Sequence, residues 1–224
     1  MPIKLAANIS YLFQEKPRLS DRYQAARDSG FKAVECGLPY DYPAEELFLA
    51  KNKAGVQHIL INTPSGDQNR QELGLAALPA HENEFKDSLE VAIKYAKALD
   101  CKRIHIYAGK SMNIITDNAM ETTYYDNLTM AAERLKQENL IGLIQPMNTV
   151  SVPRYYMSNF DDGHVQIAQV PDRHEPDTPG EIDFRYILNL FDELGYLGWI
   201  GLEYTPKGHT VSGLKWIKDF GYSL

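Results

Sequence analysis

Apolar and polar positions follow two alternating periods along the chain. Short apolar runs, typical of buried strands, are followed by segments whose apolar residues recur every three or four positions, as in amphipathic helices. This pattern predicts strands at residues 3–8, 31–36, 56–62, 103–107, 140–145, 163–169 and 198–204. It predicts helices at residues 20–29, 44–54, 81–99, 119–138, 184–194 and 210–220, with Ser20 and Asp183 as N-caps and Gly55 and Gly195 after helix ends.

Strands that alternate with helices are normally parallel and joined by right-handed crossovers. Two folds have this arrangement, a (β/α)₈ TIM barrel and a doubly wound sheet. A doubly wound sheet usually carries a Gly-rich phosphate loop after its first strand, whereas here that strand runs into Asn8, Ile9 and Ser10. We therefore predict a TIM barrel, here shortened to about seven parallel strands, as a single domain over residues 1–224.

The composition narrows the class of protein. The chain has 224 residues and a formal net charge of −7, without a basic run, which argues against a nucleic-acid partner. No apolar window is long enough to cross a membrane, and the N-terminus lacks the apolar core of a signal peptide. Cys36 and Cys101 have no metal-binding or redox spacing and fit buried thiols in a reducing compartment. We expect a cytoplasmic protein without a membrane partner, and leave a homo-oligomer open.

Polar residues at the ends of the predicted strands suggest where chemistry takes place. In a TIM barrel the active site lies at the carboxyl ends of the strands, and Gln145, Gln166 and Glu203 occupy such positions. Their oxygen atoms, if they converge, suit a hard divalent cation such as Mg²⁺ or Mn²⁺, with a carboxylate beside it to move a proton. The alternative is that the two amides only fill a polar core.

Motifs spread over the whole chain indicate a family. They are Ala6-Ala7-Asn8, Gly30-Phe31-Lys32-Ala33-Val34-Glu35, Leu60-Ile61-Asn62-Thr63-Pro64, Tyr95-Ala96-Lys97-Ala98-Leu99, Arg103-Ile104-His105, Gln145-Pro146-Met147-Asn148, the run 163–184 and Gly201-Leu202-Glu203-Tyr204. In these motifs the chain resembles hydroxypyruvate isomerase and its animal relatives, within the xylose-isomerase-like barrels. The resemblance implies a divalent-metal isomerase of glyoxylate metabolism. Its small hydroxy-oxo acid substrate would be hydroxypyruvate, interconverted with 2-hydroxy-3-oxopropanoate (tartronate semialdehyde) by proton transfer between adjacent carbons.

The resemblance also assigns roles to individual residues. Glu203 corresponds to one acid/base glutamate, which is also a metal ligand, and Gln166 corresponds to another ligand. Arg173, with His174 and Glu175 beside it, lies where relatives contact substrate. The family's other catalytic glutamate is replaced by Gln145, whose amide cannot accept a proton at neutral pH.

The chain also departs from the family between Phe160 and Gly163, where relatives have a further βα unit that contributes an Asp ligand. Such a unit has roughly 30 residues or more. With two carboxylates missing, we expect weak binding of Mg²⁺ or Mn²⁺. Loss of a positioned base typically costs 10²–10⁴-fold in rate. Three hypotheses follow: a metal-dependent isomerase, a catalytically impaired or inactive relative that acts as a binding or interaction protein, and a metal-free barrel that binds a sugar or an acid.

Overall fold

The computed structural model describes residues 3–67, 72–110, 117–145, 147, 154–156 and 165–224. The chain divides into two compact units. The first comprises residues 1–36, 42–59 and 164–224, and the second comprises residues 37–41 and 60–163. A single domain over residues 1–224 stays a prediction.

The first unit contains a parallel sheet of five strands in the order β3-β2-β1-β8-β7. Its strands are β1 (Lys4–Asn8), β2 (Ala33–Glu35), β3 (Gln57–His58), β7 (Val165–Ile167) and β8 (Trp199–Leu202). In the register of this sheet Asn8 lies beside Glu35, and Gly201 lies between Ala6 and Gln166. Polar or small residues of four strands therefore lie within two register positions of one another.

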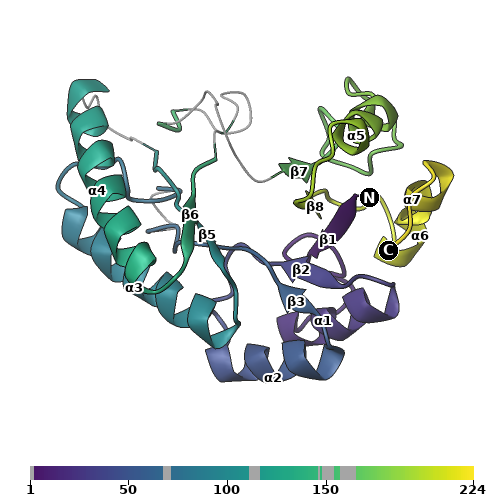
Figure 1. Cartoon of the computed structure of the whole chain (residues 1–224), viewed down its shortest axis with the longest axis horizontal. Helices are drawn as coiled ribbons and strands as arrows, with labels where there is room; N and C mark the ends of the chain where they lie inside the picture. Colours follow the sequence, from purple (N-terminus) through teal and green to yellow (C-terminus); the bar gives the residue numbers. More distant parts are fainter. Residues whose placement is uncertain (1–2, 68–71, 111–116, 146, 148–153, 157–164) are drawn as a thin grey trace. The chain divides into compact units, whose positions relative to one another are not determined.

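Five helices of this unit lie in the described residues, and α1 and α2 pack side by side in Figure 1. They are α1 (Leu19–Asp28), α2 (Ala44–Ala54), α5 (Phe184–Glu193), α6 (Thr210–Gly213) and α7 (Lys215–Asp219). The predicted caps at Asp183 and Gly55 are confirmed, since Asp183 accepts a hydrogen bond from Tyr186 N and Gly55 has a left-handed φ of 69°. The prediction that Ser20 is the N-cap of the first helix is wrong, because α1 begins at Leu19 and Arg18 is its N-cap. The helix predicted at residues 210–220 is broken in two at Leu214.

The first sheet curls inward. Its strands β2 and β7 are separated by β1 and β8, so in a flat sheet they would lie about 14 Å apart, which is three strand spacings. Side chains that stand perpendicular to such a sheet would not meet. Nevertheless, Gln166 Nε2 of β7 donates a hydrogen bond to Glu35 Oε1 of β2 at 2.5 Å. This contact requires the curvature that is typical of a barrel wall.

The second unit contains a parallel sheet in the order β4-β5-β6. The strands are β4 (Ile61–Asn62), β5 (Arg103–His105) and β6 (Ile141–Leu143), and the helices are α3 (Glu82–Ala98) and α4 (Asp117–Gln137). The strand predicted at residues 56–62 is divided, because residues 57–58 pair with β2 and residues 61–62 pair with β5. All seven predicted strands otherwise form within the described part of the chain, shorter at their ends than predicted.

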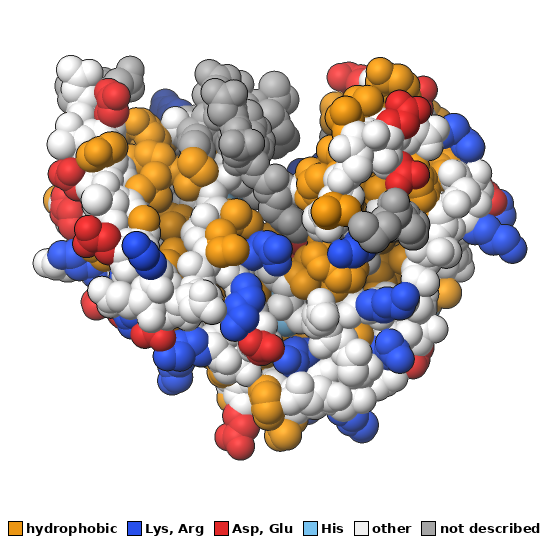
Figure 2. All heavy atoms as spheres, in the orientation of Figure 1, with side chains coloured by type: hydrophobic (Ala, Val, Ile, Leu, Met, Phe, Trp, Pro, Cys, Tyr) orange, Lys and Arg blue, Asp and Glu red, His pale blue; other side chains and the backbone are white. Residues whose placement is uncertain are grey.

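The edge strand β6 lies beside an apolar groove. The groove has a volume of about 460 Å³ and runs between α4 and β6, where Figure 2 shows hydrophobic side chains at the surface. Ile141 of β6 is 51% exposed, which is unusual for an isoleucine in a parallel sheet. The groove is lined mainly by Leu128, Ala132, Leu135, Ile141 and Ile144.

Candidate active site

An ion pair at the end of β8 brings together two of the predicted site residues. Arg173 Nη2 donates hydrogen bonds to Glu203 Oε2 at 2.8 Å and to the Glu203 carbonyl oxygen at 2.9 Å. The Glu203 side chain is 20% exposed and that of Arg173 is 43% exposed. The pair is therefore partly shielded, and a small molecule could still reach it.

The loop after β7 holds Arg173 in place. Arg173 has a φ of 55°, a left-handed conformation that is rare for residues other than glycine. Its backbone N–H donates to Gln169 O and its carbonyl accepts from Thr205 N, both at 2.7 Å. A non-glycine residue keeps such a conformation only where surrounding contacts impose it. The side chain is thus presented to Glu203 by a fixed backbone.

Gln169 is the organising residue of this loop, and the sequence analysis did not identify it. Its buried amide accepts hydrogen bonds from Val170 N at 2.9 Å and Ile182 N at 3.1 Å. Its Nε2 donates to the carbonyl oxygens of Ile182 and Thr178 at 2.9 and 3.2 Å, and to Pro176 O at 3.4 Å. The sequence feature that could have identified Gln169 is its position, as a polar residue at the end of the predicted strand 163–169.

Gln166 and Glu203 point to the same face of the first sheet. Gln166 lies directly beside Gly201 in the register, and Glu203 follows Gly201 by two residues, so its side chain lies on the same side. Gln166 of β7 and Glu203 after β8 therefore lie on one face of the sheet, and their convergence on a common ligand stays a prediction. Gln145 belongs to the second unit, so its convergence with them stays a prediction.

Tyr11 is a further residue of this region that the sequence analysis missed. The guanidinium carbon of Arg173 lies 5.8 Å from the centre of the Tyr11 ring. Burial raises the pKa of Tyr11, and the nearby Glu203 carboxylate raises it further, whereas Arg173 acts in the opposite direction. The phenol therefore stays protonated at neutral pH and can donate a hydrogen bond. An aromatic residue shortly after a strand end was the only signal.

The structure places the other two predicted substrate residues in structural contacts. His174 Nδ1 lies 2.9 Å from Thr205 O. Glu175 is buried, and its carboxylate oxygens accept hydrogen bonds from Lys207 N at 3.1 and 3.3 Å. These contacts hold the ends of β7 and β8 together, and substrate contact by His174 or Glu175 stays a prediction.

Strand ends of the second unit form a polar cluster of their own. Asn62 Nδ2 donates to Tyr107 Oη at 2.7 Å, and His105 Nδ1 lies 3.2 Å from Asn62 Oδ1. His105 is buried, as is His58 in the first unit, which lies 2.9 Å from Tyr23 Oη. Both histidines are core residues with a hydrogen bond.

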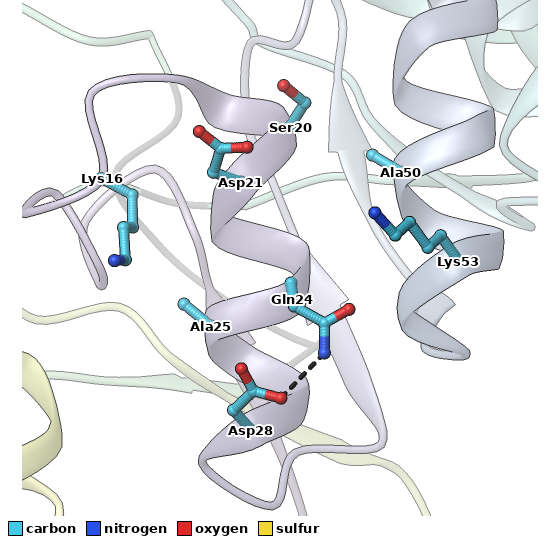
Figure 3. Close-up of a pocket in the computed structure, with 8 residues that line it drawn as sticks. All are labelled: Lys16, Ser20, Asp21, Gln24, Ala25, Asp28, Ala50 and Lys53. Atoms are coloured by element: carbon cyan, nitrogen blue, oxygen red, sulfur yellow. Dashed lines mark hydrogen bonds between the residues drawn. The ribbon is translucent and has the colours of Figure 1, made fainter.

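The described residues contain no carboxylate-rich metal cluster, and a second groove holds none of the predicted site residues. No group of three or more His, Cys, Asp or Glu side chains placed to hold a metal ion occurs within the described ranges. A groove of about 420 Å³ between α1 and α2 is lined by residues that include Lys16, Asp21, Asp28 and Lys53 (Figure 3). Its two cations and two anions balance, and none of the six predicted site residues lines it.

Comparison with known proteins establishes the family. The family model of xylose isomerase-like TIM barrels matches residues 23–163 and 157–220. The chain belongs to the xylose isomerase-like TIM barrels. This xylose isomerase-like chain is similar to a crystal structure from Brucella melitensis, named as an AP endonuclease of family 2, with a TM-score of 0.90 and 33% identity. The match covers 98% of this chain and 99% of the Brucella melitensis chain.

Curated relatives narrow the comparison. A protein of Danio rerio named "Putative hydroxypyruvate isomerase" is 40% identical over 264 positions, covering 98% of this xylose isomerase-like chain and 96% of the relative. The hydroxypyruvate isomerase of Escherichia coli K12 is 34% identical, covering 97% and 99%. The 2-oxo-tetronate isomerase of Haemophilus influenzae is 35% identical, covering 97% and 99%.

The alignment with the Danio rerio protein shows that this chain is shorter than that relative. An alignment of 264 positions against a chain of 224 residues leaves at least 40 positions at which only the Danio rerio protein has a residue. The family model matches in two parts that meet at residues 157–163, which agrees with the predicted loss of a βα unit before Gly163. The junction itself lies outside the described residues.

Proposed function

We propose that this chain is an isomerase of a small hydroxy-oxo acid, with hydroxypyruvate and 2-hydroxy-3-oxopropanoate as the interconverted pair. The observation that carries the proposal is the Arg173–Glu203 pair, 2.8 Å from nitrogen to oxygen, at the end of β8. It provides an anion that can carry a proton and a cation that can bind a carboxylate. The names of relatives at 34–40% identity support the choice of substrate.

The reaction requires one carbon-bound proton to move. A base removes a proton from the hydroxymethyl carbon of hydroxypyruvate, and the same proton or another is returned to the neighbouring carbonyl carbon. One hydroxyl proton moves to the other oxygen, so that no electron acceptor is needed. Glu203 is placed to be the base, and the guanidinium of Arg173 would exchange its bond with Glu203 for the carboxylate of the substrate.

A divalent cation fits this region weakly. Gln166 Nε2 is bonded to Glu35, which leaves the amide oxygen of Gln166 and the Glu203 carboxylate as donors of the kind that Mg²⁺ or Mn²⁺ prefers. One carboxylate is the lower limit for such ions, and water would complete the shell. A bound cation would supply positive charge beside the substrate oxygens, where an enediolate develops negative charge. Gln145 would be a third oxygen donor.

Low turnover is part of the proposal. Gln145 stands where a second carboxylate is expected, and an amide cannot take up a proton at neutral pH. The loss of one positioned base costs about 10²–10⁴-fold in rate. The competing possibility is an inactive relative that only binds its ligand. An endonuclease activity, as in the name of the Brucella melitensis protein, is not favoured by a net charge of −7.

We also propose a cytoplasmic location and a role without a membrane or nucleic-acid partner. The acidic charge supports this, and no helix in the described part of the chain is long and apolar enough to span a bilayer. A homo-oligomer stays open.

A coupled assay of hydroxypyruvate isomerisation with added Mg²⁺ or Mn²⁺ tests the proposal. We expect slow turnover that Glu203→Gln abolishes, and about 10²-fold or greater acceleration in Gln145→Glu. Glu181→Gln, on an exposed residue of the same loop, is the matched control and should leave the rate unchanged. Equal turnover in Glu203→Gln and the unmodified chain would refute the role of Glu203. Turnover in the unmodified chain as fast as in Gln145→Glu would refute the predicted impairment.

A further inference from the structure

The proposed reaction does not use one buried carboxylate that lies close to it. Glu35, at the end of β2, is 1% exposed. Its Oε1 accepts hydrogen bonds from Asn8 Nδ2 at 3.0 Å and from Gln166 Nε2 at 2.5 Å. Burying a charged group is costly unless hydrogen bonds compensate for the lost water. The hydrogen bonds from Asn8 and Gln166 provide this compensation at Glu35.

The contact decides which end of the Gln166 amide faces Glu35. A carboxylate accepts hydrogen bonds and cannot donate them, so the group opposite it must be the NH₂ group. The same logic holds for Asn8, whose Nδ2 faces Glu35 while its Oδ1 accepts from Ser10 N at 3.0 Å. The oxygen of Gln166 is consequently turned away from Glu35. Within the described residues no protein donor is bonded to that oxygen.

The neighbouring strand leaves room for this arrangement. A Cβ atom on Gly201 would lie 2.4 Å from Glu35 Oε1 and 2.7 Å from its Cδ. Gly201 is also the register partner of Gln166. The carboxylate of β2 thus crosses β1 and passes over the backbone of β8 to reach β7. A larger residue at position 201 would therefore displace the Glu35 carboxylate from this path.

From these contacts we infer that Glu35 is a positioning residue, which fixes the Gln166 side chain with its amide oxygen turned away from Glu35, as an acceptor for the reaction. The use of that oxygen by a cation or substrate rests on the proposed function. The orientation of the amide does not, so the two can be tested separately.

Two variants of Glu35 distinguish the loss of its hydrogen-bond acceptor from the loss of its charge. Glu35→Met has a similar length but accepts no hydrogen bond, so the amide of Gln166 loses its anchor. Glu35→Gln keeps an oxygen that can accept from both Asn8 and Gln166. Gln166→Glu removes the side-chain NH₂ group and identifies its signal in the nuclear magnetic resonance spectrum.

The first readout is the exchange of the Gln166 NH₂ protons with water in the unmodified chain. We expect exchange slower than that of the NH₂ group of Gln24, which lies on an exposed face of α1. Exchange should be about tenfold or more faster in Glu35→Met, since a hydrogen bond to a charged group is lost, and nearly unchanged in Glu35→Gln. Equal exchange of Gln166 and Gln24 in the unmodified chain would overturn the inference even if Glu35→Met does not fold.

The second readout is the affinity for Mn²⁺, measured by electron paramagnetic resonance, with thermal unfolding of each variant as the control for general damage. Removing a residue that orients a ligand typically weakens binding 10–100-fold, which we expect for Glu35→Met and not for Glu35→Gln. An affinity in Glu35→Met equal to that of the unmodified chain would overturn the inference. If the unmodified chain bound no Mn²⁺, the proposed cation would be refuted, and the proton exchange of Gln166 would still decide the role of Glu35.

Discussion

Replacing Gln169 by leucine tests whether one amide holds the loop that presents Arg173. Leucine keeps most of the buried volume and removes every polar atom of the side chain. Four hydrogen bonds of 3.2 Å or shorter are lost, two accepted from Val170 N and Ile182 N and two donated to Ile182 O and Thr178 O. All four partners are backbone groups of the loop itself.

The expected loss of stability follows from these bonds. Each hydrogen bond contributes about 0.5–1.5 kcal/mol net, and a buried partner left unsatisfied costs about 1–3 kcal/mol. The Val170 and Ile182 side of the loop is near the surface, so water can replace part of what is lost. We therefore expect Gln169→Leu to lower the free energy of unfolding by about 2–4 kcal/mol.

Urea denaturation measures this loss, with Gln24→Leu as the matched control. The Gln24 side chain bonds to Asp28 at 2.8 Å on an exposed helix face, and its replacement should change stability by less than about 0.5 kcal/mol. Hydrogen exchange gives a local readout, because Thr205 N is bonded to Arg173 O and should lose protection. A change in Gln169→Leu no larger than in Gln24→Leu, with Thr205 still protected, would refute the argument.

Three further predictions concern other parts of the chain. Gly201→Ala should destabilise the protein by about 1–3 kcal/mol, because the new Cβ meets Glu35 Oε1 at 2.4 Å, whereas Gly208→Ala should be neutral in thermal unfolding since nothing lies within 4 Å. At Glu15, burial raises the pKa, but hydrogen bonds from Thr210 outweigh it and the pKa is lowered. The stabilisation by ionised Glu15 is therefore present above its unfolded pKa of about 4.3 and is lost as pH falls through the lower folded pKa. The difference in unfolding free energy between the unmodified chain and Glu15→Gln should shrink as the pH falls below about pH 4; a difference that does not shrink in the acid range would contradict this. Inserting the segment of the Danio rerio relative at residues 157–163 should cover the apolar groove beside Ile141 and reduce the fluorescence of a bound hydrophobic dye; equal dye binding would show that the segment packs elsewhere.

Much of the fold follows from local pattern. The helix at residues 44–54 is predicted to the residue, because Gly55 ends it in a left-handed conformation that few other residues adopt. The break at Leu214 was missed, since the apolar stripe continues through it. The division of the strand at residues 56–62 was also missed, because it depends on which neighbouring strand supplies the hydrogen bonds, and a single sequence does not record that choice.

The candidate site was only partly predictable for a similar reason. Alternation along a strand places Gly201 and Glu203 on one face, and strand ends identify Gln166. The decisive contacts join residues far apart in the sequence. Arg173 and Glu203 are 30 positions apart, Glu35 and Gln166 are 131 apart, and the partners of Gln169 lie up to 13 positions away. Contacts of this kind arise from the curvature of the sheet and the path of a loop, which period and propensity do not determine.

The loss of a βα unit before Gly163 affects the two units unequally, and this leads to a kinetic prediction. The contacts of Glu35 with Gln166 and of Arg173 with Glu203 are complete within the first unit. The altered position 145 and the junction at residues 157–163 belong to the second. Substrate binding through Arg173 should therefore survive, while proton transfer suffers. A residue that acts only in the transition state changes kcat and kcat/KM together, so Gln145→Glu should raise kcat by about 10²-fold or more with KM nearly constant. An effect confined to KM would show that residue 145 contributes to binding and does not take part in proton transfer beside Glu203.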